Sequence, residues 1–119
     1  MIPATWIEHR RAEDDELVGY LRPVDGEPDR YIPVTVFGYP LGGPTDEYDA
    51  RQTLESVGLS YLADQWWLTL DGRAEPIAVR IVEASPDRLL VKNVDFGYEG
   101  DIGATFALGV PEDGRLRRR

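Results

Sequence analysis

The sequence predicts a mainly β fold of the α+β class, with about seven strands and one helix. Runs of alternating apolar and polar residues recur along the chain, Gly- and Pro-rich turns separate them, and one segment has apolar residues at helical spacing. We expect a twisted antiparallel sheet, closed as a small barrel or folded over as a sandwich, with the helix (residues 46–57) inserted between the third and fourth strands.

Three strands are expected before the helix. They are residues 4–11 (ATWIEHRR), 16–23 (ELVGYLRP) and 31–37 (YIPVTVF). Pro33 has no N–H to donate to a ladder, so we expect an edge or a bulge in the third strand. The stretch 38–44 holds too many Gly and Pro residues to be anything but a loop.

The helix is marked at both ends. Thr45 or Asp46 can cap its start, and the acidic residues that follow suit the positive end of the helix dipole. Gly58 is a typical C-terminal stop. The residues that recur at the spacing of one apolar stripe are Ala50, Leu54 and Val57.

The second half of the chain is β again. After a connector at 59–64, which is either a helical turn or a packed loop, residues 65–70, 77–82 and 89–94 should form an antiparallel meander. Residues 104–110 (ATFALGV) form a last strand. We expect residues 1–111 to be a single β-rich domain and residues 112–119 to be a frayed tail.

Trp66 and Trp67 are adjacent, so a strand directs them to opposite faces of the sheet. We place Trp66 in the core, with this inward set: Leu17, Leu21, Ile32, Val34, Val36, Leu68, Leu70, Ile77, Val79, Ile81, Leu89 and Val91. The opposite face is rich in aromatic residues rather than polar, and its candidate binding residues are Tyr20, Tyr31, Phe37, Trp67 and Arg80. It is covered by the protein's own helix or serves a partner or ligand; a different register is the third alternative.

Charge and composition bound the function. The chain has 22 acidic and 13 basic residues, a net charge of −9, which disfavours binding to nucleic acid or to an anionic membrane. There is no Cys, so disulfides and thiolate chemistry are excluded. No stretch approaches the roughly 18 apolar residues of a membrane span, and the first residues do not resemble a secretion signal, so we expect a cytoplasmic protein.

The residues for catalysis or metal binding are sparse. His9 is the one histidine, which makes Ser–His hydrolysis improbable, and we expect it at the surface or at a strand edge. Two acidic concentrations, residues 13–16 and the group Asp95, Glu99 and Asp101, are either solvated loops or weak sites for a hard cation, and the second lacks the spacing of an EF-hand.

We therefore expect a non-enzymatic interaction or accessory module that presents its aromatic face, its acidic loops or both to a protein partner or to a second copy of itself. The alternative is a small-ligand-binding β-barrel with a pocket lined by Trp66, Tyr20 or Phe37. An enzyme that uses Asp95, Glu99 or Asp101 as acid or base comes third. The sequence implies no cofactor.

Overall fold

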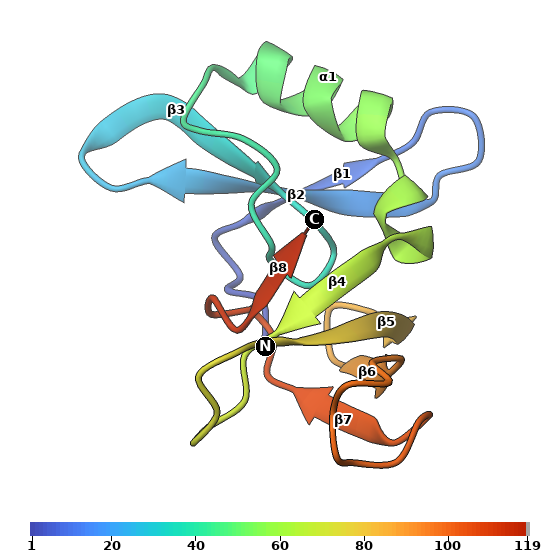
Figure 1. The fold of residues 1–119 in the computed structure, drawn as a ribbon. Coiled ribbons are helices and arrows are strands. Elements are labelled where there is room, and N and C mark those ends of the chain that lie inside the picture. Colours follow the sequence, from blue (N-terminus) through green and yellow to red (C-terminus); the bar gives the residue numbers. More distant parts are fainter. Residues whose placement is uncertain (119) are drawn as a thin grey trace.

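The computed structural model describes residues 1–118, which form two antiparallel sheets and one α-helix (Figure 1). The fold is mainly β, as the sequence predicts. In chain order the elements are β1 (Ile7–Arg10), β2 (Leu17–Val24), β3 (Glu27–Val34), α1 (Glu47–Val57), the 3₁₀ helix η1 (Ser60–Ala63), β4 (Gln65–Leu68), β5 (Ile77–Ala84), β6 (Leu89–Asn93), β7 (Thr105–Leu108) and β8 (Leu116–Arg118). The connector at 59–64 is thus largely the 3₁₀ turn.

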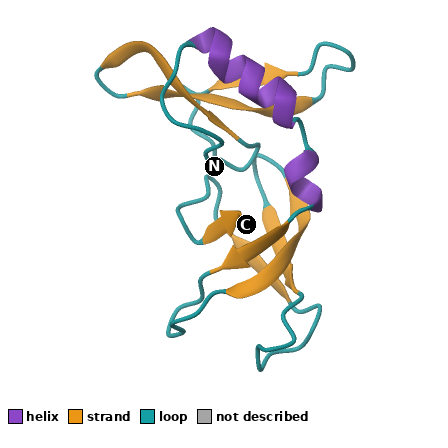
Figure 2. Ribbon diagram, turned by 45° about the horizontal axis from the view of Figure 1, so that its top comes forward, coloured by secondary structure: helices purple, strands orange, loops and turns teal. Residues whose placement is uncertain are grey.

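The first sheet has the strand order β1-β2-β3, and α1 lies across one of its faces (Figures 1 and 2). Asp46 caps the helix, because its carboxylate accepts the Asp49 N–H at 2.7 Å. The helix ends at Gly58, whose φ of 54° and N–H bond to the Leu54 carbonyl form the expected stop.

Gly19 lets the helix approach the sheet closely. A Cβ at this position would lie 2.2 Å from the Val34 carbonyl oxygen and 2.8 Å from Leu54 Cδ2. Leu54 therefore occupies the space that a side chain on β2 would need. The buried cluster at this interface consists of Val18, Leu21, Ala50 and Leu54.

The second sheet has the order β7-β6-β5-β4-β8. Strands β4, β5 and β6 form the predicted antiparallel meander, and β7 adds to its end. Trp66 is fully buried in this sheet's core, where its indole Nε1 donates to the Tyr61 carbonyl at 3.1 Å. Its ring makes edge-to-face contacts with Phe37 at 5.9 Å and Tyr39 at 4.8 Å.

The prediction of a closed barrel is wrong, because the strands form two separate sheets. A barrel would require the sheet to close on itself, but within residues 1–118 β4 pairs with β5 and β8, while β3 has β2 as its one neighbour in its sheet. After β3 the side chain of Phe37 lies in the second core, and α1 then packs across the first sheet. Both segments lie between the third strand and the fourth along the chain.

The register prediction is only partly right. Trp66, Leu68 and Val79 are buried as expected, but Tyr20 and Phe37, which we placed on the outer face, are buried too. Tyr20 lies on the face of β2 opposite the helix, where Trp6 covers it. Phe37 lies beyond the end of β3 and packs on Tyr61 as well as Trp66.

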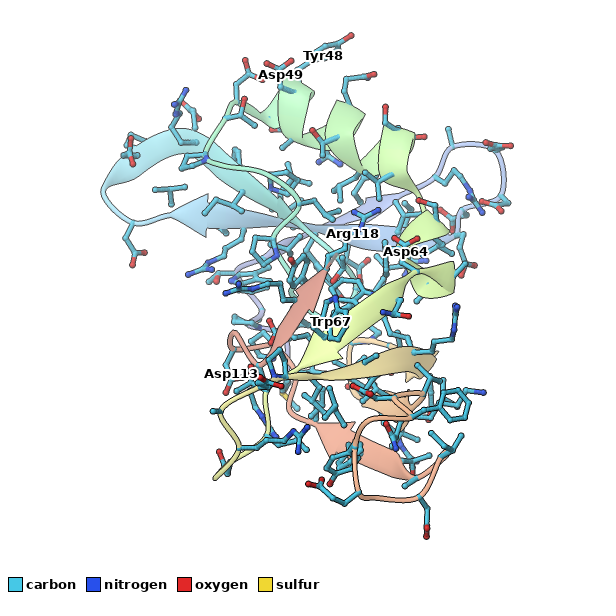
Figure 3. The ribbon with its side chains drawn as sticks, viewed as in Figure 1. Tyr48, Asp49, Asp64, Trp67, Asp113 and Arg118 are labelled. Carbon is cyan, nitrogen blue, oxygen red and sulfur yellow. The ribbon has the colours of Figure 1, made fainter. Side chains whose placement is uncertain are left out.

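The expected frayed tail over 112–119 differs from the structure. Leu116–Arg118 form β8, which pairs with β4, and Leu116 is buried in the second core. The Glu112 carboxylate accepts the N–H groups of Gly114 and Leu116, each at 2.8 Å, and holds the turn before the strand. Arg118 forms an ion pair with Asp64 at 3.0 Å (Figure 3). Arg119 lies outside the described residues.

Candidate functional site

The five residues predicted from sequence do not form one surface. Phe37 is in the core, Tyr20 is buried beneath Trp6, and Tyr31 is partly buried in β3, against the cluster under α1. Only Trp67 and Arg80 meet on a common face, which belongs to the second sheet. The helix α1 packs on β2 and β3 of the first sheet, whereas Trp67 belongs to the second sheet.

We call this surface the Trp67 face; its residues are Gln65, Trp67, Thr69, Arg80, Lys92 and Arg117. Trp67 lies opposite Arg117 of β8 on one side and Ala78 of β5 on the other. Arg80 lies opposite Gln65 and Lys92. The alternate residues Trp66, Val79, Val91 and Leu116 are buried, so the pleat directs the Trp67 face outward.

A shallow pocket of about 620 Å³ opens beside Trp67. Its lining consists of Trp67, Thr69, Glu75, Pro76 and Arg117, so it extends from the sheet onto the loop between β4 and β5. Figure 3 shows Trp67 on β4, with Asp64 and Arg118 at one end of the sheet and Asp113 toward the other. Thr69, Glu75, Pro76 and Arg117 are exposed, so the pocket is an open surface feature.

Positive charge gathers on the Trp67 face although the chain is acidic overall. Arg80, Lys92 and Arg117 are all exposed there, and none of them forms an ion pair within residues 1–118. Arg80 is held in place, because its guanidinium donates to the Ala63 carbonyl at 2.9 Å. The face thus combines an accessible indole with three cations.

A second concave surface, which the sequence reading missed, surrounds Trp6 where the two sheets meet. Three depressions of about 500, 480 and 340 Å³ share Trp6 as a lining residue, and we call them together the Trp6 groove. Trp6 is partly exposed; it packs edge-on against Tyr20 at 6.5 Å, and the Arg22 guanidinium lies 5.7 Å from its ring centre. Its indole is thus fixed by neighbours on β2.

The loop that connects β6 and β7 is held by side-chain hydrogen bonds and displays an aromatic residue. The Asp95 carboxylate accepts the N–H groups of Ala78 at 3.0 Å and Gly97 at 2.9 Å, and these bonds lower the pKa of Asp95. The buried Asn93 side chain donates to the Asp101 carbonyl at 3.0 Å. Phe96 on this loop is 90% exposed.

His9 is buried rather than at the surface, although its strand, β1, is an edge strand. Its Nε2 contacts Glu55 Oε1 at 2.9 Å and its Nδ1 contacts Arg51 Nη1 at 3.0 Å, both from α1. Because an arginine only donates, Nδ1 accepts from Arg51 and Nε2 donates to the Glu55 carboxylate. Both ring nitrogens are occupied, so His9 joins β1 to the helix and has no nitrogen left to act as a base.

Comparisons with protein-family models, curated proteins and solved structures give no match. Across residues 1–118, no three His, Asp or Glu side chains gather as they would to hold a metal ion. In the same part of the chain, no helix combines the length and the apolar character that crossing a membrane requires. The two surfaces around Trp67 and Trp6 are the candidate functional sites.

Proposed function

We propose that the protein is a non-enzymatic interaction module that docks an acidic segment of a partner protein on the Trp67 face. The observation that carries this proposal is the position of Trp67, which is partly exposed at an open pocket while its neighbour Trp66 fills the core. Exposing an indole on a strand forfeits the burial that would stabilise the fold, and a partner that covers it recovers that burial.

The residue types on the Trp67 face support a protein partner. Tryptophan and arginine are enriched among the residues that dominate binding energy at interfaces, and Trp67 lies directly opposite Arg117 across the β4–β8 pair. Both are mounted on paired strands, so their backbone positions are fixed before a partner covers them. Pro76 at the pocket wall adds a rigid apolar contact.

Charge complementarity supports an acidic segment. Arg80, Lys92 and Arg117 all project from this face, and within the pocket lining Glu75 is the one acidic residue. Carboxylates of a partner can form charge-assisted hydrogen bonds with the two guanidinium groups. A basic segment would instead meet like charges, which is unfavourable.

The same pocket supports a second candidate, a small anionic ligand. Its volume of about 620 Å³ lies within the roughly 300–1,000 Å³ range of small-molecule sites. Trp67 would then stack on the ligand and Arg117 would bind its charge. The pocket differs from the one expected inside a barrel, because Trp66 and Phe37 are packed against each other in the core.

The test compares affinity capture from a lysate by three forms of the protein: wild type, Trp67→Ser and Tyr48→Ser. Tyr48 is the matched control, because it is an aromatic residue 70% exposed on α1, away from the Trp67 face (Figure 3). We expect a specific, acidic protein that wild type and Tyr48→Ser retain and that folded Trp67→Ser loses. Equal retention by all three refutes this docking face. A thermal-shift screen with small anions tests the second candidate, and stabilisation that Trp67→Ser abolishes would favour it.

A further inference from the structure

The Trp6 groove is a second concave surface, and it shares no lining residue with the pocket of the Trp67 face. Its three depressions draw lining residues from segments far apart in the sequence: the start of the chain, β2, the loop after β3, the β5–β6 turn and the segment before β8. Trp6 lines all three, and Arg22 lines two of them, so the depressions adjoin around one indole. The groove follows the junction between the two sheets.

The walls of the groove are rich in aromatic and proline residues. Five of the chain's nine prolines line it, and they are Pro3, Pro23, Pro40, Pro86 and Pro111. Three aromatic residues join them, Trp6, Tyr20 and Tyr39. Tyr39 is fixed by its edge-to-face contact with Trp66 at 4.8 Å. Grooves lined by rigid aromatic rings are the surfaces on which polyproline II segments dock.

Two strand edges at the groove, those of β8 and β3, offer few groups for strand pairing. On the outer edge of β8, the Leu116 N–H is bound by the Glu112 carboxylate and the Arg118 N–H by the Tyr39 hydroxyl. The outer edge of β3 is bridged by the segment that follows it, through the pairs Tyr31–Thr45 and Val34–Pro40. A ligand that adds a β-strand therefore finds these edges taken. A polyproline II segment has no internal backbone hydrogen bonds and binds through its side chains and carbonyls, so it does not need a free strand edge.

The charge of the groove favours a basic ligand. Among the described residues of its lining, the acidic ones are Glu8, Asp25, Asp87, Glu112 and Asp113, whereas the cationic groups are the Arg22 side chain and the Met1 ammonium. Arg22 is stacked on Trp6, and within residues 1–118 Asp25, Asp87 and Asp113 form no ion pair. Their carboxylates are available to Arg or Lys side chains of a bound chain.

We infer that the Trp6 groove binds an extended, proline-containing segment of another protein that carries Arg or Lys residues. A proline of the ligand packs on the Trp6 and Tyr39 rings, and its basic residues reach the carboxylates of Asp25 in one depression and Asp113 in another. The site differs from the Trp67 face in position and in charge, so each can fail without the other.

The experiment pans a displayed library of random 12-residue peptides against the wild-type protein and measures the selected peptides by isothermal titration calorimetry. We expect enriched sequences that combine Pro with Arg or Lys. For each, a version with Pro replaced by Gly and a version with Arg or Lys replaced by Glu should bind at least about tenfold more weakly.

Protein variants assign the binding to the groove. Trp6→Ala should weaken it about tenfold or more, and Asp25→Asn with Asp113→Asn, a double change at exposed positions that keeps the fold, should weaken it several-fold and reduce its salt dependence. Trp67→Ser is the matched control and should bind as wild type does. Circular dichroism confirms that each variant is folded.

Three results would overturn the inference: a library that yields no binder, binders without basic residues, or binders whose affinity the double Asn variant leaves unchanged. Self-association of the wild type that Trp6→Ala abolishes, with no peptide binding, would instead assign the groove to a second copy of the chain.

Discussion

Substituting each of the two adjacent tryptophans tests whether Trp66 is buried in the core and Trp67 is on the surface. Replacing Trp66 with Ser removes a fully buried indole, its hydrogen bond to Tyr61 and its contacts with Phe37 and Tyr39. Truncating a buried Trp typically costs ~3–5 kcal/mol, and the orphaned Tyr61 carbonyl adds about 1 kcal/mol. We expect a loss of about 4 kcal/mol or more, a large part of the ~5–15 kcal/mol that stabilises a typical domain.

Trp67→Ser is the matched perturbation on the opposite face. Trp67 is partly exposed, and no hydrogen bond of its indole occurs in the described structure, so we expect its loss to cost about 1 kcal/mol. For a chain of this length each kcal/mol lowers the melting temperature by roughly 3–6 °C. Trp66→Ser should therefore lower the melting temperature by at least ~12 °C and Trp67→Ser by less than ~6 °C, as measured by circular dichroism melts and urea titration. Equal losses would show that Trp67 belongs to a second core, and the docking argument for its face would fail.

Two further predictions concern the fold. Gly19→Ala should destabilise the protein by ~3 kcal/mol or more in urea titration, because its Cβ would meet the Val34 carbonyl oxygen, a backbone atom, at 2.2 Å; a near-wild-type midpoint would contradict the close approach of Leu54 and α1. Burial raises the pKa of Tyr61 to about 12, and the Val36 backbone opposes this only weakly, without a well-formed hydrogen bond to the hydroxyl. Between about pH 10 and pH 12 the folded state therefore keeps the Tyr61 proton that the unfolded chain releases. The stability that this proton gives is fully present below about pH 10, and roughly 2–3 kcal/mol of it is lost as the pH rises to about 12. Tyr61→Phe should remove that part of the alkaline loss, and an unchanged difference between neutral and alkaline stability would show that the Tyr61 hydroxyl does not cause it.

Local structure was predictable where a few neighbouring residues determine it. Asp46 and Gly58 delimit the helix through their own side chain and backbone conformation, and the β4–β5–β6 meander follows from alternation and turns. The division into two sheets was not predictable, because alternation says which face a residue takes and not which strand it pairs with. Strand β8 was missed because Leu116 is its one apolar residue, and the strand is held by Glu112, Tyr39 and Asp64 from elsewhere in the chain.

The candidate site, too, could be predicted from the sequence only in part. The sequence correctly directs Trp67 away from Trp66, since the period of a strand requires it, and Arg80 follows on the same face. The Trp6 groove has no comparable signal. Its five prolines come from five separate segments, and only the meeting of the two sheets brings them to one indole. Each of these prolines, met in the sequence, is explained as well by a turn or a strand edge.

The net charge of −9 hides a separation of charge between the two surfaces. The Trp67 face holds Arg80, Lys92 and Arg117, whereas each of the three depressions of the Trp6 groove has acidic residues in its lining. At physiological ionic strength charges are screened beyond about 8 Å, so a docked segment responds mainly to the charges it touches. The net charge acts on the approach: it slows an acidic partner and accelerates a basic one. An acidic segment therefore depends on short-range contacts with Trp67 and the guanidinium groups to stay bound, while a basic segment is favoured at the Trp6 groove both at a distance and in contact.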